Sequence, residues 1–254
     1  MSIALFGAST YLGVAVAECL RNERGYEVIP AETVADAARA SQGVIDCLTP
    51  DGERDQALVA GLIEALAGTG LPFVYSSTAW VMGNTRGRLA GESFPLRPPP
   101  GLEWLPAVER LLFDTTVRGL RGVVIRPAVA YGRDGGLLAQ LAEGALPLIG
   151  DGGNLWSFIH VDDLAELYVL AFESAPAGSL YIAADGPSVT FKDIASACGA
   201  RRRATPEEAR AELGTLAGSL LLDQRAGSTR AGRELGWQPS RPVVLAFLAQ
   251  SIPA

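Results

Sequence analysis

The residues that most clearly point to chemistry are two glycines, Gly7 and Gly13, near the start of the chain. They lie between an apolar run, residues 3–6, and a segment with helical periodicity, residues 14–20. A strand, a tight turn and a helix in this order present backbone N–H groups to a pyrophosphate. Thr10 stands where the dinucleotide-binding pattern has its middle glycine. The segment predicts a dinucleotide site, with a turn that holds no ligand as the alternative.

Few other residues suit metal binding or acid–base catalysis. His160 is the only histidine, and the three cysteines, Cys19, Cys47 and Cys198, are scattered without the spacing of metal ligands. We therefore expect no metal site, and a structural role for His160 rather than that of a general acid. Scattered cysteines suit a reducing compartment.

Composition limits the partners of the chain. Its 254 residues carry a net charge of −7, and 48% of them are hydrophobic, which indicates a globular protein of one domain, with or without a small lobe. The strongest basic cluster is residues 201–203, so we expect no nucleic-acid partner. We expect no signal peptide before the first strand and no membrane span, because no apolar run of the sequence is long enough for one. We expect a cytoplasmic protein with no membrane partner.

Apolar runs without polar alternation predict strands that are buried on both faces of a parallel sheet. These runs cover residues 3–6, 26–30, 43–50, 71–76, 122–127 and 180–183. Helices are expected at residues 14–20, 55–68, 106–118, 164–172 and 205–222. The alternation predicts an α/β fold with a Rossmann, doubly wound, mostly parallel sheet. Residues 31–42 are few for a further strand and helix, so we expect the usual third strand to be truncated.

The order of these elements also predicts how the chain is divided. Residues 1–150 should form the dinucleotide-binding Rossmann core, to which residues 155–183 return. Residues 184–240 should form mainly a small C-terminal substrate-binding lobe or helical lid within the same integrated domain. A structural lobe is the alternative to a lid. Either Asp162 or Asp163 should cap or charge the first turn of the helix at 164.

Five segments together resemble the extended type of short-chain dehydrogenase/reductase, in the NAD-dependent epimerase/dehydratase group. They are Gly7-Ala-Ser-Thr-Tyr-Leu-Gly13, Tyr75-Ser-Ser-Thr-Ala-Trp-Val-Met-Gly83, Arg126-Pro-Ala-Val-Ala-Tyr-Gly132, Phe158-Ile-His-Val-Asp-Asp-Leu164 and Ser228-Thr-Arg-Ala-Gly-Arg-Glu-Leu-Gly-Trp-Gln-Pro239. The resemblance implies NADP(H) or NAD(H) as the cofactor. It implies that Thr78, five residues before Gly83, binds the reacting oxygen, with Ser77 beside it as a second candidate. The residues implied to hold the cofactor are Gly7, Ser9, Thr10, Tyr11, Leu12, Gly13, Leu48, Thr49, Ser76, Arg126, Pro127, Ala128 and Val129.

The chain departs from this family in the catalytic pair Tyr-x-x-x-Lys. In the family the tyrosine delivers the proton and the lysine lowers the tyrosine pKa. The only lysine here is Lys192, and position 188 is Ser188, so the sequence contains no such pair. Glu109 resembles the glutamate that follows the family lysine by four residues. This register puts Leu105 in the lysine position and Gly101 in the tyrosine position.

Hydride transfer to a ketone requires positioning and relief of the charge on oxygen, and neither strictly requires a tyrosine. We therefore predict an NAD(P)H-dependent ketoreductase that acts on a bulky aromatic polyketide ketone of the angucyclinone type. The proton comes from water or from a phenol of the substrate itself. Candidates for stacking on the aromatic substrate, with core packing as the alternative, are Trp80, Trp104, Trp156 and Phe158.

Two other functions remain open at this point. One is a non-catalytic NAD(P)-binding sensor or regulator, because Thr10 in the phosphate turn suits weak cofactor affinity. The other is a sugar-nucleotide epimerase or dehydratase, which requires a base that the chain lacks. Glu32, near the end of the second strand, favours NAD over NADP by charge repulsion. We expect a monomer or a homodimer.

Overall fold

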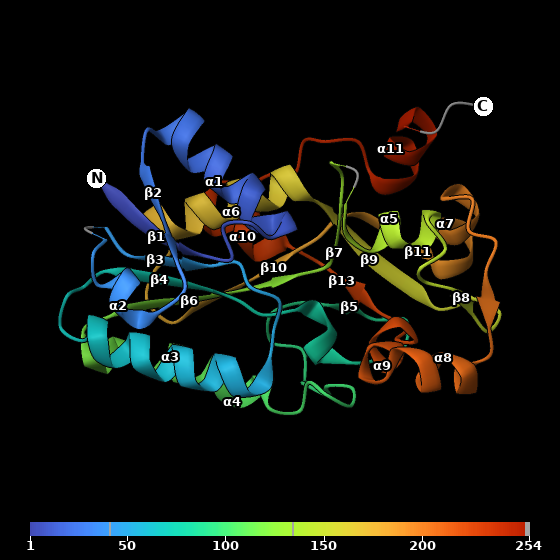
Figure 1. Ribbon diagram of the computed structural model, residues 1–254, viewed down its shortest axis with the longest axis horizontal. Helices are drawn as coiled ribbons and strands as arrows, with labels where there is room; N and C mark the ends of the chain where they lie inside the picture. Colours follow the sequence, from blue (N-terminus) through green and yellow to red (C-terminus); the bar gives the residue numbers. More distant parts are fainter. Residues whose placement is uncertain (41, 134, 252–254) are drawn as a thin grey trace.

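The computed structural model describes residues 1–40, 42–133 and 135–251 (Figure 1). Six parallel strands form the main sheet in the order β10–β6–β4–β3–β1–β2. Their bounds are β1 (Ser2–Phe6), β2 (Glu27–Ala31), β3 (Val44–Asp46), β4 (Pro72–Ser76), β6 (Arg121–Pro127) and β10 (Ser179–Ala183). Every residue of β1, β4 and β10 is buried, as expected for strands covered on both faces. The predicted doubly wound parallel sheet is confirmed.

Helices cover both faces of this sheet (Figure 1). On one face lie α1 (Tyr11–Arg24) and α6 (Val161–Ser174), and on the other lie α3 (Gly52–Leu66) and α4 (Leu105–Phe113). Successive residues of β1 alternate between the two cores: Ile3 and Leu5 pack with α1 and α6, whereas Ala4 and Phe6 pack with α3 and α4. The strand period of two thus explains why β1 is apolar throughout.

The second strand, β2, forms one edge of the sheet. Among the described residues between β2 and β3, the chain forms only the short helix α2 (Val34–Ala37) and no strand. The usual third strand is therefore missing altogether, because this connection is too short to hold a strand and a full crossover helix.

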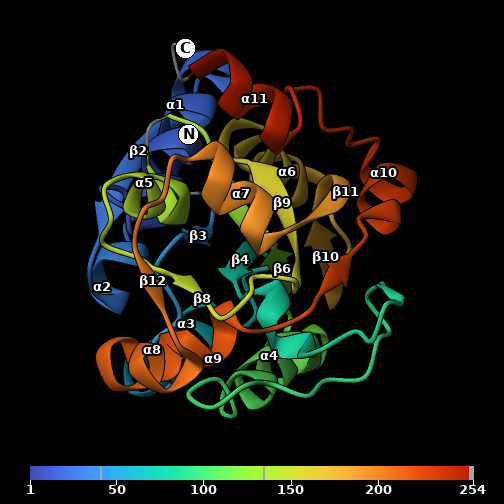
Figure 2. The ribbon, with the colours of Figure 1, turned by 90° about the vertical axis from the view of Figure 1, so that its right-hand side faces the viewer.

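Smaller elements form a lobe beside the main sheet (Figures 1 and 2). Its sheets are β11 (Asp185–Thr190) with β9 (Leu155–His160) and β7 (Val129–Tyr131), and β12 (Arg203–Ala204) with β8 (Leu148–Ile149). Its helices are α5 (Gly136–Ala142), α7 (Phe191–Ala197), α8 (Pro206–Leu213), α9 (Thr215–Leu220) and α11 (Val244–Ser251). A separate apolar core, which includes Trp156, Phe158 and Phe191, holds them together.

The segment 184–240 does not lie in the lobe alone. Within it, β13 (Arg225–Ala226) pairs with β5 (Leu89–Ala90), and α10 (Thr229–Leu235) contacts β10 and α6 of the main layers. The division of the chain into a dinucleotide-binding core and a substrate-binding lobe or lid stays a prediction.

One predicted strand is shorter than expected. The strand expected at residues 43–50 ends at Asp46, because the Leu48 N–H turns back to Asp46 Oδ1 at 2.9 Å. The helices expected at residues 205–222 are α8 and α9, which meet at Gly214, whose φ of +57° no helix can continue. No helix in the described part of the chain has both the length and the apolarity needed to cross a bilayer.

The cap of α6 is neither of the two aspartates that we expected. His160 is the N-cap, and its Nδ1 accepts the Asp162 N–H at 3.2 Å. Asp162 and Asp163 do charge the first turn favourably. Asp163 is buried and accepts hydrogen bonds from the backbone and the guanidinium of Arg241.

Candidate functional site

The turn between β1 and α1 is built for close backbone contact. Gly7 has a φ of +69°, and a Cβ there would lie 3.0 Å from the carbonyl of Cys47. A Cβ on Gly13 would lie 1.8 Å from the carbonyl oxygen of Gly7. Both positions therefore require glycine, and α1 begins directly against the end of β1.

Thr10 does not obstruct this turn, because its hydroxyl points into the loop. Its Oγ1 lies 2.8 Å from the carbonyl oxygen of Gly7 and 3.0 Å from that of Cys47. It also accepts the Gly13 N–H at 3.0 Å as the N-cap of α1. The side chain that replaces the middle glycine thus ties the turn to the end of β3 and leaves the phosphate-binding geometry in place.

Two cavities meet at this turn. One, of about 540 Å³, lies between the turn and the end of β2, and the other, of about 250 Å³, lies over the ends of β3, β4 and β6. Thr10 and Leu48 line both. Together they form a groove at the carboxyl ends of the parallel strands, where the strand order reverses between β1 and β3. The shape, the glycine turn and the helix N-terminus fit a dinucleotide.

Most of the predicted cofactor residues line this groove. Those that do are Gly7, Ser9, Thr10, Tyr11, Leu12, Leu48, Thr49, Ser76, Pro127, Ala128 and Val129. Gly13 lies beneath the turn, and the side chain of Arg126 is buried under α4 instead. The Ser76 hydroxyl is held inside the fold, 2.5 Å from the Asp46 carbonyl oxygen and 2.6 Å from the Tyr168 hydroxyl.

Charges of both signs reach the end of the groove beside β2. Glu32 lines the larger cavity together with Arg21 and Arg54. Arg54 is already paired with Asp55 at 2.8 Å and donates to the carbonyl oxygen of Thr49. The role of Glu32 in favouring NAD over NADP stays a prediction.

The two hydroxyls predicted to do chemistry have different surroundings. Ser77 is 3% exposed, and its Oγ donates to Glu109 Oε1 at 2.5 Å. Thr78 is half-buried, and both it and Ser77 line the smaller cavity. Its Oγ1 accepts the Trp80 N–H at 3.3 Å as the N-cap of η1 (Ala79–Met82). Among the described residues no protein acceptor takes the Thr78 proton, so Thr78 rather than Ser77 can donate to a substrate oxygen.

The sequence did not reveal the partner of Ser77. Glu109 is also bound by Arg126, with Nε 2.8 Å from Oε1 and Nη2 2.5 Å from Oε2. Both side chains are almost fully buried where α4 packs against β6. Only the four-residue spacing of Leu105 and Glu109 hinted that Glu109 faces the sheet.

The smaller cavity lacks ionisable groups suited to proton abstraction. Of the described residues that line it, none is Asp, Glu, His, Lys or Arg. Cys47 lines it, but burial raises the pKa of its thiol well above the usual range. The Tyr11 hydroxyl donates to the Gly132 carbonyl oxygen at 2.6 Å. The cavity therefore offers hydroxyl and backbone groups for hydrogen bonding, but no general base.

Of the four aromatic residues predicted to contact substrate, the structure places one in the cavity. Trp80 is half-buried and lines it. Trp104 packs against Gly52 at the start of α3, and its Nε1 donates to the Gly101 carbonyl oxygen at 2.9 Å. Trp156 stacks on Phe191 with centroids 4.2 Å apart, and Phe158 lies beside it in the lobe core. These three positions favour the core-packing alternative.

His160 lies outside the groove and has a structural place. Its ring meets Tyr131 edge-on at 5.2 Å, and burial is the main cause that lowers its pKa. The backbone N–H of His160 donates to Asp185 at 2.8 Å, and the Tyr131 hydroxyl donates to the same carboxylate. In the described part of the chain, no group of three or more His, Cys, Asp or Glu side chains forms a metal site.

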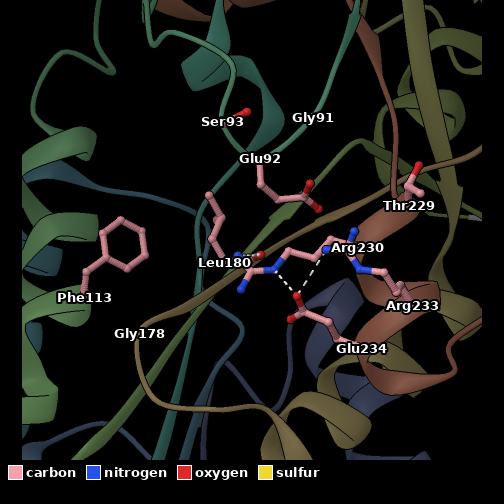
Figure 3. A pocket seen from close by; sticks show the side chains of 10 residues that line it. All are labelled: Gly91, Glu92, Ser93, Phe113, Gly178, Leu180, Thr229, Arg230, Arg233 and Glu234. Atoms are coloured by element: carbon pink, nitrogen blue, oxygen red, sulfur yellow. Dashed lines mark hydrogen bonds and ion pairs between the residues drawn. The ribbon is translucent and has the colours of Figure 1, made fainter.

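A second large cavity, of about 630 Å³, lies away from the groove, beside the outer strand β10 (Figure 3). Glu92, Arg230 and Glu234 converge there (Figure 3). Arg230 Nε pairs with Glu234 at 2.9 Å, and Glu92 accepts the Ile182 N–H at 3.2 Å. Arg230 Nη1 bonds the Leu180 carbonyl oxygen at 3.3 Å. Arg230 and Glu234 pair with each other, and Arg230 and Glu92 bond the backbone of β10, as in an edge strand protected from further pairing.

The sequence matches known proteins over most of its length. The model of the NAD dependent epimerase/dehydratase family matches residues 31–184. A Streptomyces protein named 3-diazoavenalumate denitrifying reductase is 32% identical over 72% of this chain and 66% of its own length. An uncharacterized protein of Schizosaccharomyces pombe is 30% identical over 77% of this chain and 69% of its own length. The chain thus spans about two thirds of these relatives.

Solved structures share the fold. UDP-glucose 4-epimerase of Thermus thermophilus, in complex with NAD, superposes with a TM-score of 0.74 at 20% identity. The match covers 98% of this chain and 96% of the epimerase.

Proposed function

The chain belongs to the NAD-dependent epimerase/dehydratase family, and we propose that it is an NAD(P)H-dependent reductase that works without a tyrosine–lysine pair. NAD(P) is the cofactor of this family. When bound, it supplies a hydride from its nicotinamide ring. The turn from Gly7 to Gly13, with Leu48, Thr49 and Ala128, would hold it along the groove.

The observation that carries the proposal is the lack of a base in the smaller cavity. Epimerisation and dehydration require a group that removes a proton from the substrate, and the described lining offers none. Reduction requires only a positioned acceptor and relief of the charge that develops on it. Reduction is therefore the reaction that this lining supports best.

Thr78 is the residue that we assign to the reacting oxygen. Its hydroxyl proton has no protein acceptor in the described structure, so it can donate to the oxygen as negative charge develops. One such donor contributes about 10²- to 10³-fold to the rate. Trp80, Leu48 and Leu137 provide an apolar wall that keeps water from the bond being formed.

The substrate we propose is an aromatic polyketide ketone with a phenol next to the carbonyl. Hydride forms the new C–H bond, the C=O π pair moves to oxygen, and the alkoxide takes the phenolic proton. The phenolate then takes a proton from water. Such a substrate supplies the acid that the chain lacks, and the half-buried ring of Trp80 suits a planar ligand.

A second candidate acceptor is an aryl diazonium group. The named Streptomyces relative, at 32% identity, is a denitrifying reductase of a diazo compound. Hydride addition to the aryl carbon forms C–H and breaks C–N, and N2 leaves with the electron pair of that bond. This reaction needs no proton, so it also suits a site without a tyrosine.

Absorbance of the reduced nicotinamide tests these proposals. The probes are 8-hydroxy-1-tetralone, its 8-methoxy analogue and benzenediazonium, each with NADH and NADPH and with a protein-free control. We expect the hydroxy ketone to be reduced, and the methoxy ketone at least about tenfold more slowly. Equal rates would dismiss the substrate phenol, and turnover of benzenediazonium alone would favour the second candidate.

Two results would contradict a reductase. Saturable dinucleotide binding without turnover of any probe would favour a sensor or regulator. Turnover of a UDP-sugar would favour the epimerase or dehydratase alternative.

A further inference from the structure

Three side chains that are distant in sequence form one buried cluster under the groove. Glu109, on α4, accepts hydrogen bonds from Ser77 at the end of β4 and from Arg126 on β6. The three residues are at most 3% exposed. The two parallel N–H bonds from Arg126 match both carboxylate oxygens, a geometry that fixes orientation as well as distance.

The cluster is connected to the reacting site by one peptide bond. The Ser77 N–H donates to the Ile125 carbonyl oxygen at 2.8 Å, so both its backbone and its side chain are held. Thr78 follows directly and has an extended backbone, with φ −150° and ψ 147°. This backbone aims the Thr78 hydroxyl at the first turn of η1 and at the cavity.

We propose that Ser77, Glu109 and Arg126 are positioning residues that hold Thr78 against the reacting oxygen. The inference rests on the proposed reductase function and deepens it. In this chain Gly101 and Leu105 stand at the positions of the family's tyrosine and lysine, so Glu109 is the buried polar group through which α4 contacts the site. A hydroxyl displaced by about 1 Å costs on the order of 10²-fold in rate.

Stability alone does not explain the buried pair. In the described structure, Arg126 Nη1 is buried without a hydrogen-bond partner, which costs free energy. Apolar side chains of similar volume often replace a buried ion pair without loss of stability. A pair retained despite this cost is consistent with a role in geometry.

Two single variants of Ser77 test the proposal with 8-hydroxy-1-tetralone as the probe. S77A removes the hydroxyl and leaves the Glu109–Arg126 pair intact. We expect kcat to fall about 10- to 100-fold, with KM and the dinucleotide dissociation constant within about twofold of wild type. S77T restores the hydroxyl and should recover most of kcat. S157A is the matched control, because it removes another buried serine hydroxyl, one that bonds Ser188 and the Ala226 N–H.

A double variant distinguishes loss of positioning from loss of folding. Glu109→Leu with Arg126→Met removes both charges together, so we expect it to fold with an unchanged or higher Tm and to lose kcat as S77A does. Adding S77A to it should cause no further loss, because the three residues act as one unit. An S77A kcat equal to that of S157A would overturn the proposal, and so would additive losses.

A crystal structure of S77A separates this inference from the reductase proposal. We expect Thr78 Oγ1 to leave the Trp80 N–H. An unmoved Thr78 would overturn the positioning role even if wild-type protein reduces no probe. Failure of the wild type to reduce any probe, with Thr78 displaced in S77A, would overturn only the reductase.

Discussion

Ser77 Oγ lies 2.5 Å from Glu109 Oε1, and this bond separates the roles of two neighbouring hydroxyls. The Ser77 hydroxyl donates a hydrogen bond to a buried carboxylate. The Thr78 hydroxyl has no protein acceptor among the described residues, so it can donate to a ligand in the cavity. Both residues match the family segment that binds the reacting oxygen. The hydrogen bond supports the proposal that Thr78 has the chemical role and Ser77 a positioning role.

Gly13→Ala should weaken dinucleotide binding. The new Cβ would lie 1.8 Å from the Gly7 carbonyl oxygen, so the turn must open or α1 must shift. We expect a loss of affinity of at least about tenfold by fluorescence titration, with a lower Tm. Gly218→Ala, within α9, is the control. A Cβ there would have its nearest neighbour, Pro100, at an ordinary contact distance of 3.6 Å, so this variant should leave binding unchanged.

Thr10→Val tests whether the hydroxyl holds the phosphate turn. The variant loses the cap of α1 and the contact with the Cys47 carbonyl oxygen, so unfolding should become easier by about 1–2 kcal/mol. Dinucleotide affinity should fall as well. Thr205→Val removes a comparable cap from α8, away from the groove. Equal effects of the two variants on affinity would show that Thr10 has no special role.

Glu32→Ala should shift the cofactor preference toward NADPH. Removing one carboxylate from the cavity that also holds Arg21 and Arg54 relieves repulsion of a 2′-phosphate by about 1 kcal/mol, or about fivefold in affinity. Glu27→Ala, at the opposite end of β2, is the control. An unchanged ratio of NADPH to NADH affinity would remove Glu32 from the site.

Placing the family's tyrosine and lysine at positions 101 and 105 should not restore the acid–base chemistry of that pair. Gly101 has a φ of +90°, and a Cβ there would lie 2.7 Å from the Thr215 side chain. Gly101→Tyr combined with Leu105→Lys should therefore destabilise the fold by at least about 1–3 kcal/mol. Thermal unfolding and turnover of 8-hydroxy-1-tetralone check this, with Leu105→Met as the control for the buried position. A faster, equally stable double variant would contradict the prediction.

Stability should fall as the pH rises from about 4 to about 7. Burial raises the pKa of Asp46 to about 7, above its value of about 3.9 in an unfolded chain. Protonated Asp46 therefore contributes stability that is fully present below about pH 4 and is lost as the pH rises through about 7. Asp185, whose pKa burial raises to about 6, acts in the same direction.

Asp46→Asn isolates the first of these two groups. Asparagine stays neutral and can still accept the Leu48 N–H, so the free energy of unfolding should fall less steeply between about pH 4 and pH 8. Asp185 contributes to the slope that remains, and His160, whose pKa burial lowers, opposes it. Denaturant titrations across this range provide the measurement, and an unchanged slope would contradict the assignment.

The local sequence pattern was enough to predict many of the strands and the glycine turn. The apolar runs predicted β1 and β4 because a strand buried on both faces must be apolar at every position. The spacing of Gly7 and Gly13 predicted the turn because no side chain fits at either position. The absence of a tyrosine–lysine pair was also evident from the sequence, since it depends only on residue identity.

Tertiary structure decided which side chains can act. Ser77, Glu109 and Arg126 meet only because β4 and β6 are neighbours in the sheet and α4 covers them. The Thr10 hydroxyl points into the loop because the carbonyl oxygen of Cys47, at the end of β3, lies within hydrogen-bond distance. Hydrogen bonds between residues so distant in the chain leave no periodic signal in the sequence, because strand order and helix packing, rather than local propensity, bring the partners together.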